Sequence, residues 1–340
     1  MIHRSKAPLR IGLAGGGTDV SPYCDQFGGA ILNATISLNA YATIEIIEGD
    51  KIIVEAVDRD EKEVYDWQTI LPINGQLDLL KGVYNRIQKD YPFEKRGFKL
   101  STYVDAPAGS GLGTSSTLVV AIVGAFVEML QLPLGEYDIA HYAYEIERTD
   151  LQFAGGRQDQ YAATFGGVNY MEFYSGEKVI VNPLRIRQRY IDELENNLLL
   201  YYTSTSRESA ELIKRQSKNV TEKKQSSIDA MHELKHQAQM MKEALLKGQL
   251  NEIGNILDIG FEQKRKMAEG INNQLIDDIY AAAKASGATG GKISGAGGGG
   301  FMIFYCPGIS KYRVIKSLEK FGGLARNYQF TKHGLKTWTV

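Results

Sequence analysis

The pattern of apolar and polar residues predicts strands near the start of the chain. Residues 30–57 alternate in polarity and are rich in Ile, Val, Thr and Ala, with a Gly-Asp pair at positions 49 and 50. Such alternation is typical of strands, and the Gly-Asp pair is typical of the turn between two of them. Around Arg10 every second residue is apolar. This spacing predicts a strand with Arg10 on the face opposite the apolar residues.

A helix, a strand, a glycine-rich loop and a buried helix are predicted next. Apolar residues recur at helical spacing over 77–89, and residues 97–105 then alternate. The loop 107–116, with the sequence PAGSGLGTSS, leads into residues 114–130, which are apolar nearly all round. A helix of that kind is typically buried in a core. A further helix is predicted over 136–149.

The second half of the chain begins after a charged stretch at 183–197, where we place a domain boundary. A strand is predicted directly after it, and residues 206–286 have a helical pattern with breaks near two glycines and a serine. The end of the chain returns to strand, helix and strand. The predicted fold class is therefore α+β, in two domains that cover residues 1–190 and 191–340.

Composition and charge exclude several classes of protein. The 340 residues are 43% hydrophobic and 23% charged, with a net charge of -1. No broad basic surface for nucleic acid or an anionic membrane is therefore expected. The longest apolar run, residues 118–127, is far shorter than a membrane-spanning helix, which needs about 18 residues. We predict a cytoplasmic protein, in which Cys24 and Cys306 are reduced and act as small hydrophobic residues.

Glycine is the unusual feature of the composition. The chain has 36 glycines against 8 prolines, and many of the glycines gather at 15–17, 109–113 and 290–300. Because glycine lacks a side chain, such clusters let backbone N–H groups approach a ligand closely. Three clusters of this kind in one chain suggest one shared site.

The loop at 107–116 is the clearest candidate for binding phosphate. It lies where a strand ends and a helix begins, so free N–H groups and the positive end of the helix dipole face its ligand. It lacks the Gly-Lys-Ser/Thr ending of a Walker A loop and the third glycine of the dinucleotide fingerprint. Hydroxyl groups replace the lysine. The predicted phosphate-binding residues are Pro107, Ala108, Gly109, Ser110, Gly111, Leu112, Gly113, Thr114, Ser115 and Ser116.

Three ordered motifs resemble those of the GHMP small-molecule kinases, the family of galactokinase, homoserine kinase, mevalonate kinase and phosphomevalonate kinase. The family loop P-x-x-x-G-L-G-S-S is matched from Pro107 to Ser115, with Thr114 in place of a serine. The opening motif A-P-x-R, followed by a glycine turn and T-D, is matched from Ala7 to Asp19. The third, glycine-rich motif is matched at 292–300. This resemblance implies a ribosomal-S5-like N-terminal domain and a ferredoxin-like C-terminal domain with the active site between them.

The resemblance also implies catalytic roles. ATP and Mg²⁺ are the expected cofactors, with Glu147 and the Ser115 hydroxyl as the metal ligands. Asp159 is the expected general base or orienting group for the acceptor hydroxyl, and Arg10 is the cation beside it or beside the γ-phosphate. Asp19 matches the sugar-binding acid of the sugar kinases. The predicted substrate-binding residues are Gly15, Gly16, Gly17, Thr18, Asp19, Gly297 and Gly298.

The opening segment suggests a substrate. Galactokinases resemble G-E-H-T-D at the position where this chain has G-G-G-T-D, so the glutamate and histidine that would touch a hexose are missing. The opening closely resembles the D-glycero-D-manno-heptose 7-phosphate kinases of GDP-heptose synthesis, which phosphorylate the C1 hydroxyl. A sugar phosphate partner is therefore expected, with Lys6, Arg4 and Arg157 as candidates to hold its phosphate. The alternatives are a fucokinase- or galactokinase-like enzyme acting on a neutral sugar, and a non-catalytic sensor of ATP and sugar. No oligomeric state is predicted.

Overall fold

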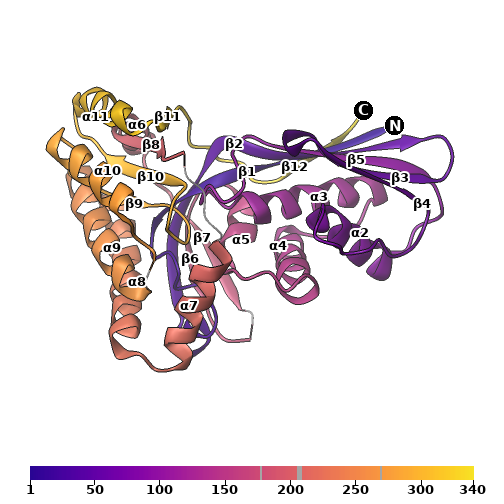
Figure 1. Cartoon of the computed structure of the whole chain (residues 1–340), viewed down its shortest axis with the longest axis horizontal. Helices are drawn as coiled ribbons and strands as arrows, with labels where there is room; N and C mark the ends of the chain where they lie inside the picture. The colour runs from indigo at the N-terminus through magenta and orange to yellow at the C-terminus, as the bar shows by residue number, and fades with distance from the viewer. Residues whose placement is uncertain (177, 205–208, 269) are drawn as a thin grey trace.

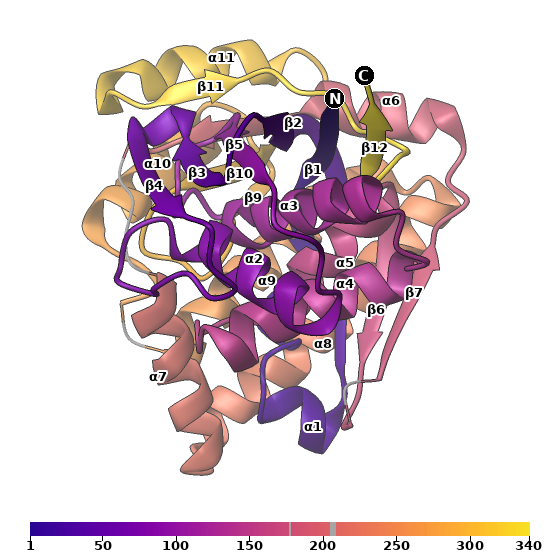
Figure 2. The same ribbon diagram turned by 90° about the vertical axis from the view of Figure 1, so that its right-hand side faces the viewer.

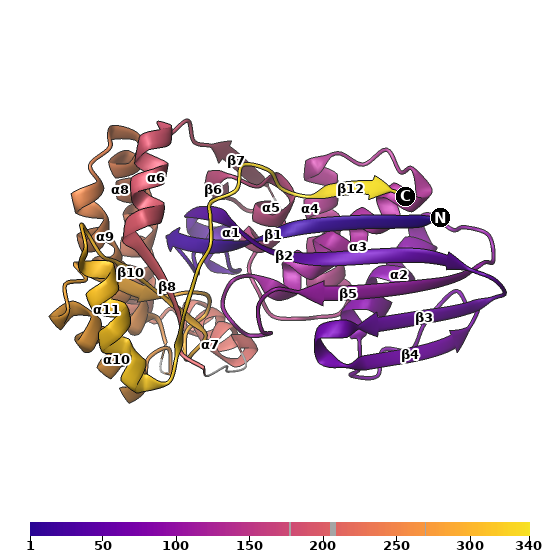
Figure 3. The same cartoon turned by 90° about the horizontal axis from the view of Figure 1, so that it is seen from above.

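The computed structural model describes residues 1–176, 178–204, 209–268 and 270–340 and has two units, each built on a sheet (Figure 1). Within these residues the first sheet has eight strands, in the order β12-β1-β2-β5-β3-β4, and β6 and β7 extend it from β2. The second sheet has the order β11-β8-β10-β9. Figure 3 shows the two units side by side along the long axis. The predicted α+β class in two domains is confirmed.

The first unit contains most of the N-terminal half of the chain. Helices α2 to α5 lie on one face of its sheet, with α3 nearest β1 and β2 (Figure 2). The bounds are β1 (Ile2–Ala14), α1 (Tyr23–Phe27), β2 (Gly29–Ile47), β3 (Lys51–Ala56), β4 (Glu61–Asp66), α2 (Asp78–Asp90), β5 (Gly97–Val104), α3 (Thr114–Leu130), α4 (Glu136–Glu145), α5 (Gln158–Phe165), β6 (Val168–Phe173), β7 (Val179–Pro183) and β12 (Lys336–Thr339).

The second unit places helices against its smaller sheet. Helices α8 and α9 form an antiparallel pair, and α8 also contacts β1 and β2 of the first unit. The bounds are α6 (Gln188–Asn197), β8 (Leu198–Tyr202), α7 (Ser209–Thr221), α8 (Gln225–Lys247), α9 (Ile253–Met267), α10 (Gln274–Ala285), β9 (Gly290–Ile293), β10 (Phe301–Tyr305), α11 (Ser310–Leu318) and β11 (Leu324–Arg326).

The predicted buried helix is the centre of the first core. Helix α3 begins at Thr114 and ends at Leu130, and most of its residues are buried. The turn at Gly49 between β2 and β3 is also present, with φ of 85° at the glycine. These elements confirm the predictions from periodicity. Both cysteines are buried and free, as predicted.

Three features differ from the sequence predictions. The helix predicted over 136–149 leaves the α-helical geometry after Glu145 and continues as a π-helical turn, Ile146–Asp150. Residues 183–197, where a boundary was expected, contain α6. The last strand, β12, pairs with β1 although it lies in the predicted C-terminal domain. The division at residue 190 stays a prediction.

In the described part of the chain no helix is long and apolar enough to cross a membrane.

Candidate active site

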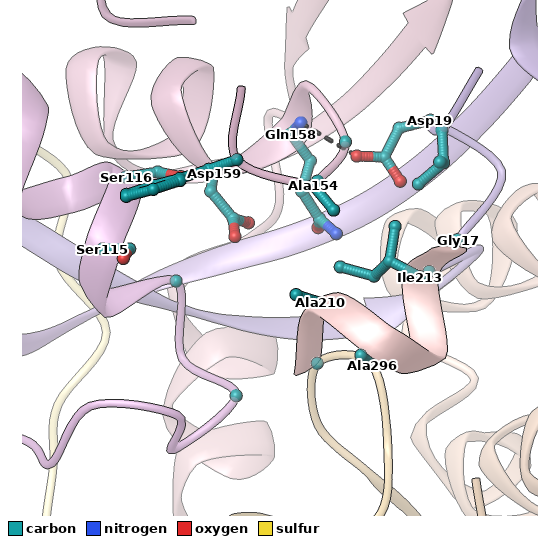
Figure 4. Close-up of a pocket in the computed structure, with 18 of the residues that line it drawn as sticks. Gly17, Asp19, Ser115, Ser116, Ala154, Gln158, Asp159, Ala210, Ile213 and Ala296 are labelled. Carbon is teal, nitrogen blue, oxygen red and sulfur yellow. Dashed lines mark hydrogen bonds between the residues drawn. The ribbon is translucent and has the colours of Figure 1, made fainter. Parts of the chain in front are cut away.

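A cavity of about 650 Å³ brings the three glycine clusters together. Gly16 and Gly17 line it from the turn after β1, residues of the loop before α3 line a second side, and Gly295 and Ala296 line a third. Figure 4 shows Asp159 between Ser115 and Ser116 on one side and Asp19 and Gly17 on the other. The sequence prediction of one site shared by the three clusters agrees with this arrangement.

Two of the glycine clusters touch directly, which explains why side chains are absent there. A Cβ atom on Gly111 would lie 2.6 Å from the carbonyl oxygen of Ser294, and one on Gly295 would lie 2.6 Å from the Cα of Gly111. Both glycines have positive φ, a conformation that other residues rarely adopt. The Ser294 hydroxyl donates to the Gly111 carbonyl at 2.8 Å, and the Phe301 N–H donates to the Ser110 carbonyl at 2.8 Å. The loop before α3 is therefore held by the second unit.

Arg10 and Asp159 form an ion pair inside the cavity. The Nε and Nη2 atoms of Arg10 each lie 2.7 Å from Oδ1 of Asp159, and Nη1 donates to the Gly111 carbonyl at 2.6 Å. The Arg10 side chain is buried, whereas 21% of the Asp159 side chain is exposed. Because Arg10 occupies only one carboxylate oxygen, Oδ2 of Asp159 is available to a ligand.

Asp19 is fixed by the start of α5, the helix that carries Asp159. Its Oδ2 atom accepts the backbone N–H groups of Arg157 at 2.9 Å and Gln158 at 3.0 Å. A Cβ on Gly156 would overlap the Asp19 carboxylate, so the close contact between residue 156 and Asp19 requires a glycine at position 156. Burial and the charge of Asp159 raise the pKa of Asp19. The hydrogen bonds from the two N–H groups lower it but do not cancel this effect. The carboxylate is thus held close to the expected position of a substrate.

The residues expected at the metal lie on the opposite side of the cavity from Asp19. Ser115 is exposed and lines the cavity, whereas the Ser116 hydroxyl accepts from Gln160 at 3.1 Å. The buried Glu147 carboxylate accepts from Gln160 at 2.5 Å and lies 3.6 Å from Nη1 of Arg148. One carboxylate and one hydroxyl suit Mg²⁺, which usually takes few protein ligands and keeps waters or phosphate oxygens. Among the described residues, no group of three or more His, Cys, Asp or Glu side chains could hold a metal ion.

Two buried lysines at the cavity were missed by the sequence analysis. Lys264, from α9, donates to the Gly295 carbonyl, and Lys292, from β9, donates to the Gly12 carbonyl at 3.0 Å. Burial and the Arg10 charge lower the pKa of Lys264 to about 8, although Asp19 raises it. Burial and the charges of Lys264 and Arg10 also lower the pKa of Lys292. Lys264 lies on the buried, apolar face of α9 with Phe261 and Met267.

Several predicted residues do not line the cavity and support its walls instead. Thr18 is buried and donates its hydroxyl to the carbonyls of Gly15 and Ala30, which holds the turn. Gly298 donates its N–H to the carbonyl of Ile271 at 2.8 Å. The predicted nucleotide and substrate residues outside the lining are Pro107, Ser110, Leu112, Gly15, Thr18, Gly297 and Gly298.

The candidates for holding the substrate phosphate also lie outside the cavity. Arg4 and Lys6 are in the half of β1 that pairs with β12. The Arg157 guanidinium donates to the Tyr174 carbonyl at 2.9 Å and to Asp25 at 3.2 Å. None of the three lines the cavity. These suggestions are corrected by the structure: Arg4 and Lys6 lie at the end of β1 away from the site, and the Arg157 side chain is already bonded to Tyr174 and Asp25.

Two family models match the chain. The N-terminal domain of GHMP kinases matches residues 78–167, and the C-terminal domain of GHMP kinases matches residues 241–324. A heptose kinase of Campylobacter jejuni, D-glycero-alpha-D-manno-heptose 7-phosphate kinase, is 47% identical over 337 residues, which cover 99% of each chain. The chain belongs to the GHMP kinases. The predicted family and its kinase class are confirmed, and ATP is the phosphoryl donor that this family membership supports.

Two further relatives of this GHMP kinase are named as sugar kinases. The crystal structure of a D-glycero-D-manno-heptose 1-phosphate kinase from Bacteroides thetaiotaomicron is 46% identical, has a TM-score of 0.85 and covers 99% of both chains. The L-fucokinase/L-fucose-1-P guanylyltransferase of Bacteroides fragilis is 26% identical over 87% of this GHMP kinase and 34% of its own length.

Proposed function

We propose that this GHMP kinase transfers the γ-phosphoryl group of ATP to the anomeric C1 hydroxyl of D-glycero-D-manno-heptose 7-phosphate, forming the 1,7-bisphosphate for GDP-heptose synthesis in the cytoplasm. The observation that carries the proposal is the cavity itself, where the Arg10–Asp159 pair lies between the glycine loop before α3 and the Asp19 carboxylate. The relative that is 47% identical over 99% of both chains supports the sugar.

The reaction requires positioning and charge neutralisation more than covalent chemistry. In our proposal the C1 oxygen attacks the γ-phosphorus, the bond from that phosphorus to the bridging oxygen breaks, and ADP leaves. Asp159 accepts the hydroxyl proton through its free oxygen, while Arg10 holds the carboxylate in place. The Asp19 carboxylate accepts hydrogen bonds from sugar hydroxyls.

Mg²⁺ is part of the proposal. Glu147 and the Ser115 hydroxyl would hold it, and when bound it would neutralise charge on the nucleotide phosphates. Glu147 is buried, and its ion-pair partner, Nη1 of Arg148, lies 3.6 Å away. A buried carboxylate with so long an ion pair favours a second cation nearby.

The decisive experiment is a kinase assay with a panel of sugars. ADP release is measured with heptose 7-phosphate, the same heptose without phosphate, heptose 1-phosphate, L-fucose and galactose. We expect kcat/KM for the 7-phosphate to exceed that for the unphosphorylated heptose by at least about a hundredfold, because two charge-assisted contacts contribute roughly 1.5 to 3 kcal/mol each.

Phosphorus NMR of the product then shows which hydroxyl reacts. A glycosyl phosphate at C1 supports the proposal, and this measurement matters because the names of the two heptose kinase relatives differ in the position of the phosphate. Preference for neutral L-fucose would favour a fucokinase instead, and the absence of turnover with every sugar would favour a sensor. Asp159→Asn is the control, since losing a general base typically lowers kcat by at least about 10²-fold.

A further inference from the structure

Two buried ammonium groups face one glycine of the cavity wall. A Cβ atom on Gly16 would lie 3.9 Å from Nζ of Lys264 and 3.9 Å from Nζ of Lys292. The two lysines come from different elements, α9 and β9, and both are about 4% exposed. Gly16, Lys264 and Lys292 all line the cavity, so the two ammonium groups are within reach of a ligand bound there.

The positive charge at this place is only partly balanced by the protein, because the Asp19 carboxylate acts on Lys264 through space without forming an ion pair with it. Each lysine has three N–H donors but makes one hydrogen bond to a carbonyl, Lys264 to Gly295 and Lys292 to Gly12. Within the described residues neither lysine forms an ion pair. Arg10 is different, because Asp159 neutralises it at 2.7 Å. Buried charges are normally paired, so an anion is the partner that this arrangement lacks.

An unpartnered amide lies at the same place. Gln216 of α7 is 3% exposed and lines the cavity, and among the described residues its Nε2 atom has no hydrogen-bond partner. A Cβ on Gly17, the neighbour of Gly16, would lie 3.5 Å from the Gln216 side-chain oxygen. A buried N–H group without a partner costs free energy, and a ligand oxygen would satisfy it.

We propose that the ammonium groups of Lys264 and Lys292, with the Gln216 amide beside them, bind the phosphate group that the sugar substrate carries. This inference rests on the proposed function. The nucleotide phosphates are expected at the loop before α3, across Asp159 from Gly17 (Figure 4). Lys264 and Lys292 therefore replace Arg4, Lys6 and Arg157 as the residues that select a phosphorylated sugar.

The test measures the preference for the phosphate group. In Lys264→Met and Lys292→Met we expect kcat/KM for heptose 7-phosphate to fall at least about thirtyfold, as expected for loss of a charge-assisted contact. The values for unphosphorylated heptose and KM for ATP should change less than threefold. Lys266→Met is the matched control, because Lys266 is exposed on the same helix, and its kinetics should equal those of the wild type.

Other outcomes overturn the inference. An equal fall with both sugars, or a rise in KM for ATP alone, would assign the lysines to the γ-phosphate or to folding. If both variants keep the wild-type preference for heptose 7-phosphate over the unphosphorylated heptose, the two lysines do not bind the substrate phosphate. If the wild type itself does not use heptose 7-phosphate, the proposed function fails, and binding of inorganic phosphate then tests the site separately.

Inorganic phosphate is the second probe, and it tests the site even if a methionine variant folds poorly. It should raise the melting temperature of the wild type and of Lys264→Arg, which keeps the charge, and it should compete with the sugar in the wild-type assay. Phosphate that competes with ATP and not with the sugar would overturn the inference.

Discussion

Ser115 and Ser116 are neighbours in the first turn of α3, but their hydroxyls have different surroundings. Ser115 is exposed and lines the cavity, whereas Ser116 is buried and bonded to Gln160, which also bonds Glu147. Ser115 therefore presents its oxygen to the cavity, whereas the Ser116 hydroxyl is buried and engaged with Gln160.

We expect Ser115→Ala to raise the Mg²⁺ concentration needed for half-maximal activity about tenfold, which corresponds to losing one ligand of roughly 1.4 kcal/mol. Ser116→Ala should instead lower the melting temperature, because it leaves Gln160 without one partner. Titration of activity with Mg²⁺ at saturating ATP, with thermal melts of both variants, measures the two effects. Identical Mg²⁺ dependence of the two variants would mean that Ser115 is not a metal ligand.

The proposed role of Lys264 should make substrate binding depend on pH. Its pKa is lowered to about 8 by burial and Arg10, while Asp19 opposes this, and the pKa of Lys292 is lowered as well. A bound phosphate dianion would raise both values, because an opposite charge favours the ammonium form. The ammonium form of Lys264 predominates below about pH 8, so affinity should weaken as pH rises through that value.

At pH 8 we expect heptose 7-phosphate to take up protons from the buffer as it binds, and its Kd to increase between pH 7 and pH 9. Calorimetric titrations in buffers with different ionisation enthalpies measure the uptake. The substrate phosphate, with a second pKa of about 6, stays a dianion in this range. Lys264→Arg should take up fewer protons, and equal uptake by both proteins would exclude Lys264 as the linked group.

At the scale of elements, the contact between two glycine loops determines the shape of the cavity beside the loop before α3. Gly111 has φ of 82° and approaches the Ser294 carbonyl, so a side chain there meets two obstacles: the backbone angle and the neighbouring loop. Gly49 has nearly the same φ, 85°, but no atom lies within 4 Å of its added Cβ. Comparing the two glycines therefore separates the cost of the backbone angle from the cost of a collision with the neighbouring loop.

Gly49→Ala should cost only the strain of a left-handed conformation, about 1 kcal/mol, with normal kinase activity. Gly111→Ala adds the collision, so we expect a larger loss of melting temperature and at least a tenfold increase in KM for ATP. Differential scanning calorimetry and steady-state kinetics on the two variants test this. Equal melting temperatures with unchanged KM would mean that the loops can separate without loss.

The elements also show what a single sequence can predict. Helix α3 was predictable from its apolar residues, and the three glycine clusters from composition, because both signals are local. Helix α5 was missed, since its eight residues carry little periodicity and are held by the Asp19 carboxylate at its start. Lys264 gave a weak signal, a charged residue on an apolar helix face, but its hydrogen-bond partner, Gly295, lies 31 residues away in the chain, and that of Lys292, Gly12, lies 280 residues away. Contacts between distant segments cannot be derived from spacing alone.

At the scale of the whole molecule, the C-terminal segment joins the second unit back to the first. The chain leaves the second sheet at β11 and reaches β12 beside β1 (Figure 3). The hydroxyls of Thr337 and Thr339 donate to the Glu128 carboxylate at 2.7 and 2.8 Å, and Leu335 covers Gly124 of α3. The segment thus closes the edge of the first sheet and covers its central helix.

Removing residues 335–340 should lower the melting temperature by at least about 5 °C while kcat at 20 °C stays within about twofold of the intact kinase. The loss comprises the strand pairing and the partly buried Leu335, about 1 to 2 kcal/mol for the side chain alone. A kilocalorie corresponds to roughly 2 to 4 °C in a unit of about 150 to 250 residues, such as the first unit. The cavity residues are untouched, so the chemistry should persist at low temperature. Leu335→Ala in the full chain removes only the packing contribution, and its smaller shift separates packing from pairing. An unchanged melting temperature in the shortened chain would show that the β1 edge needs no cover.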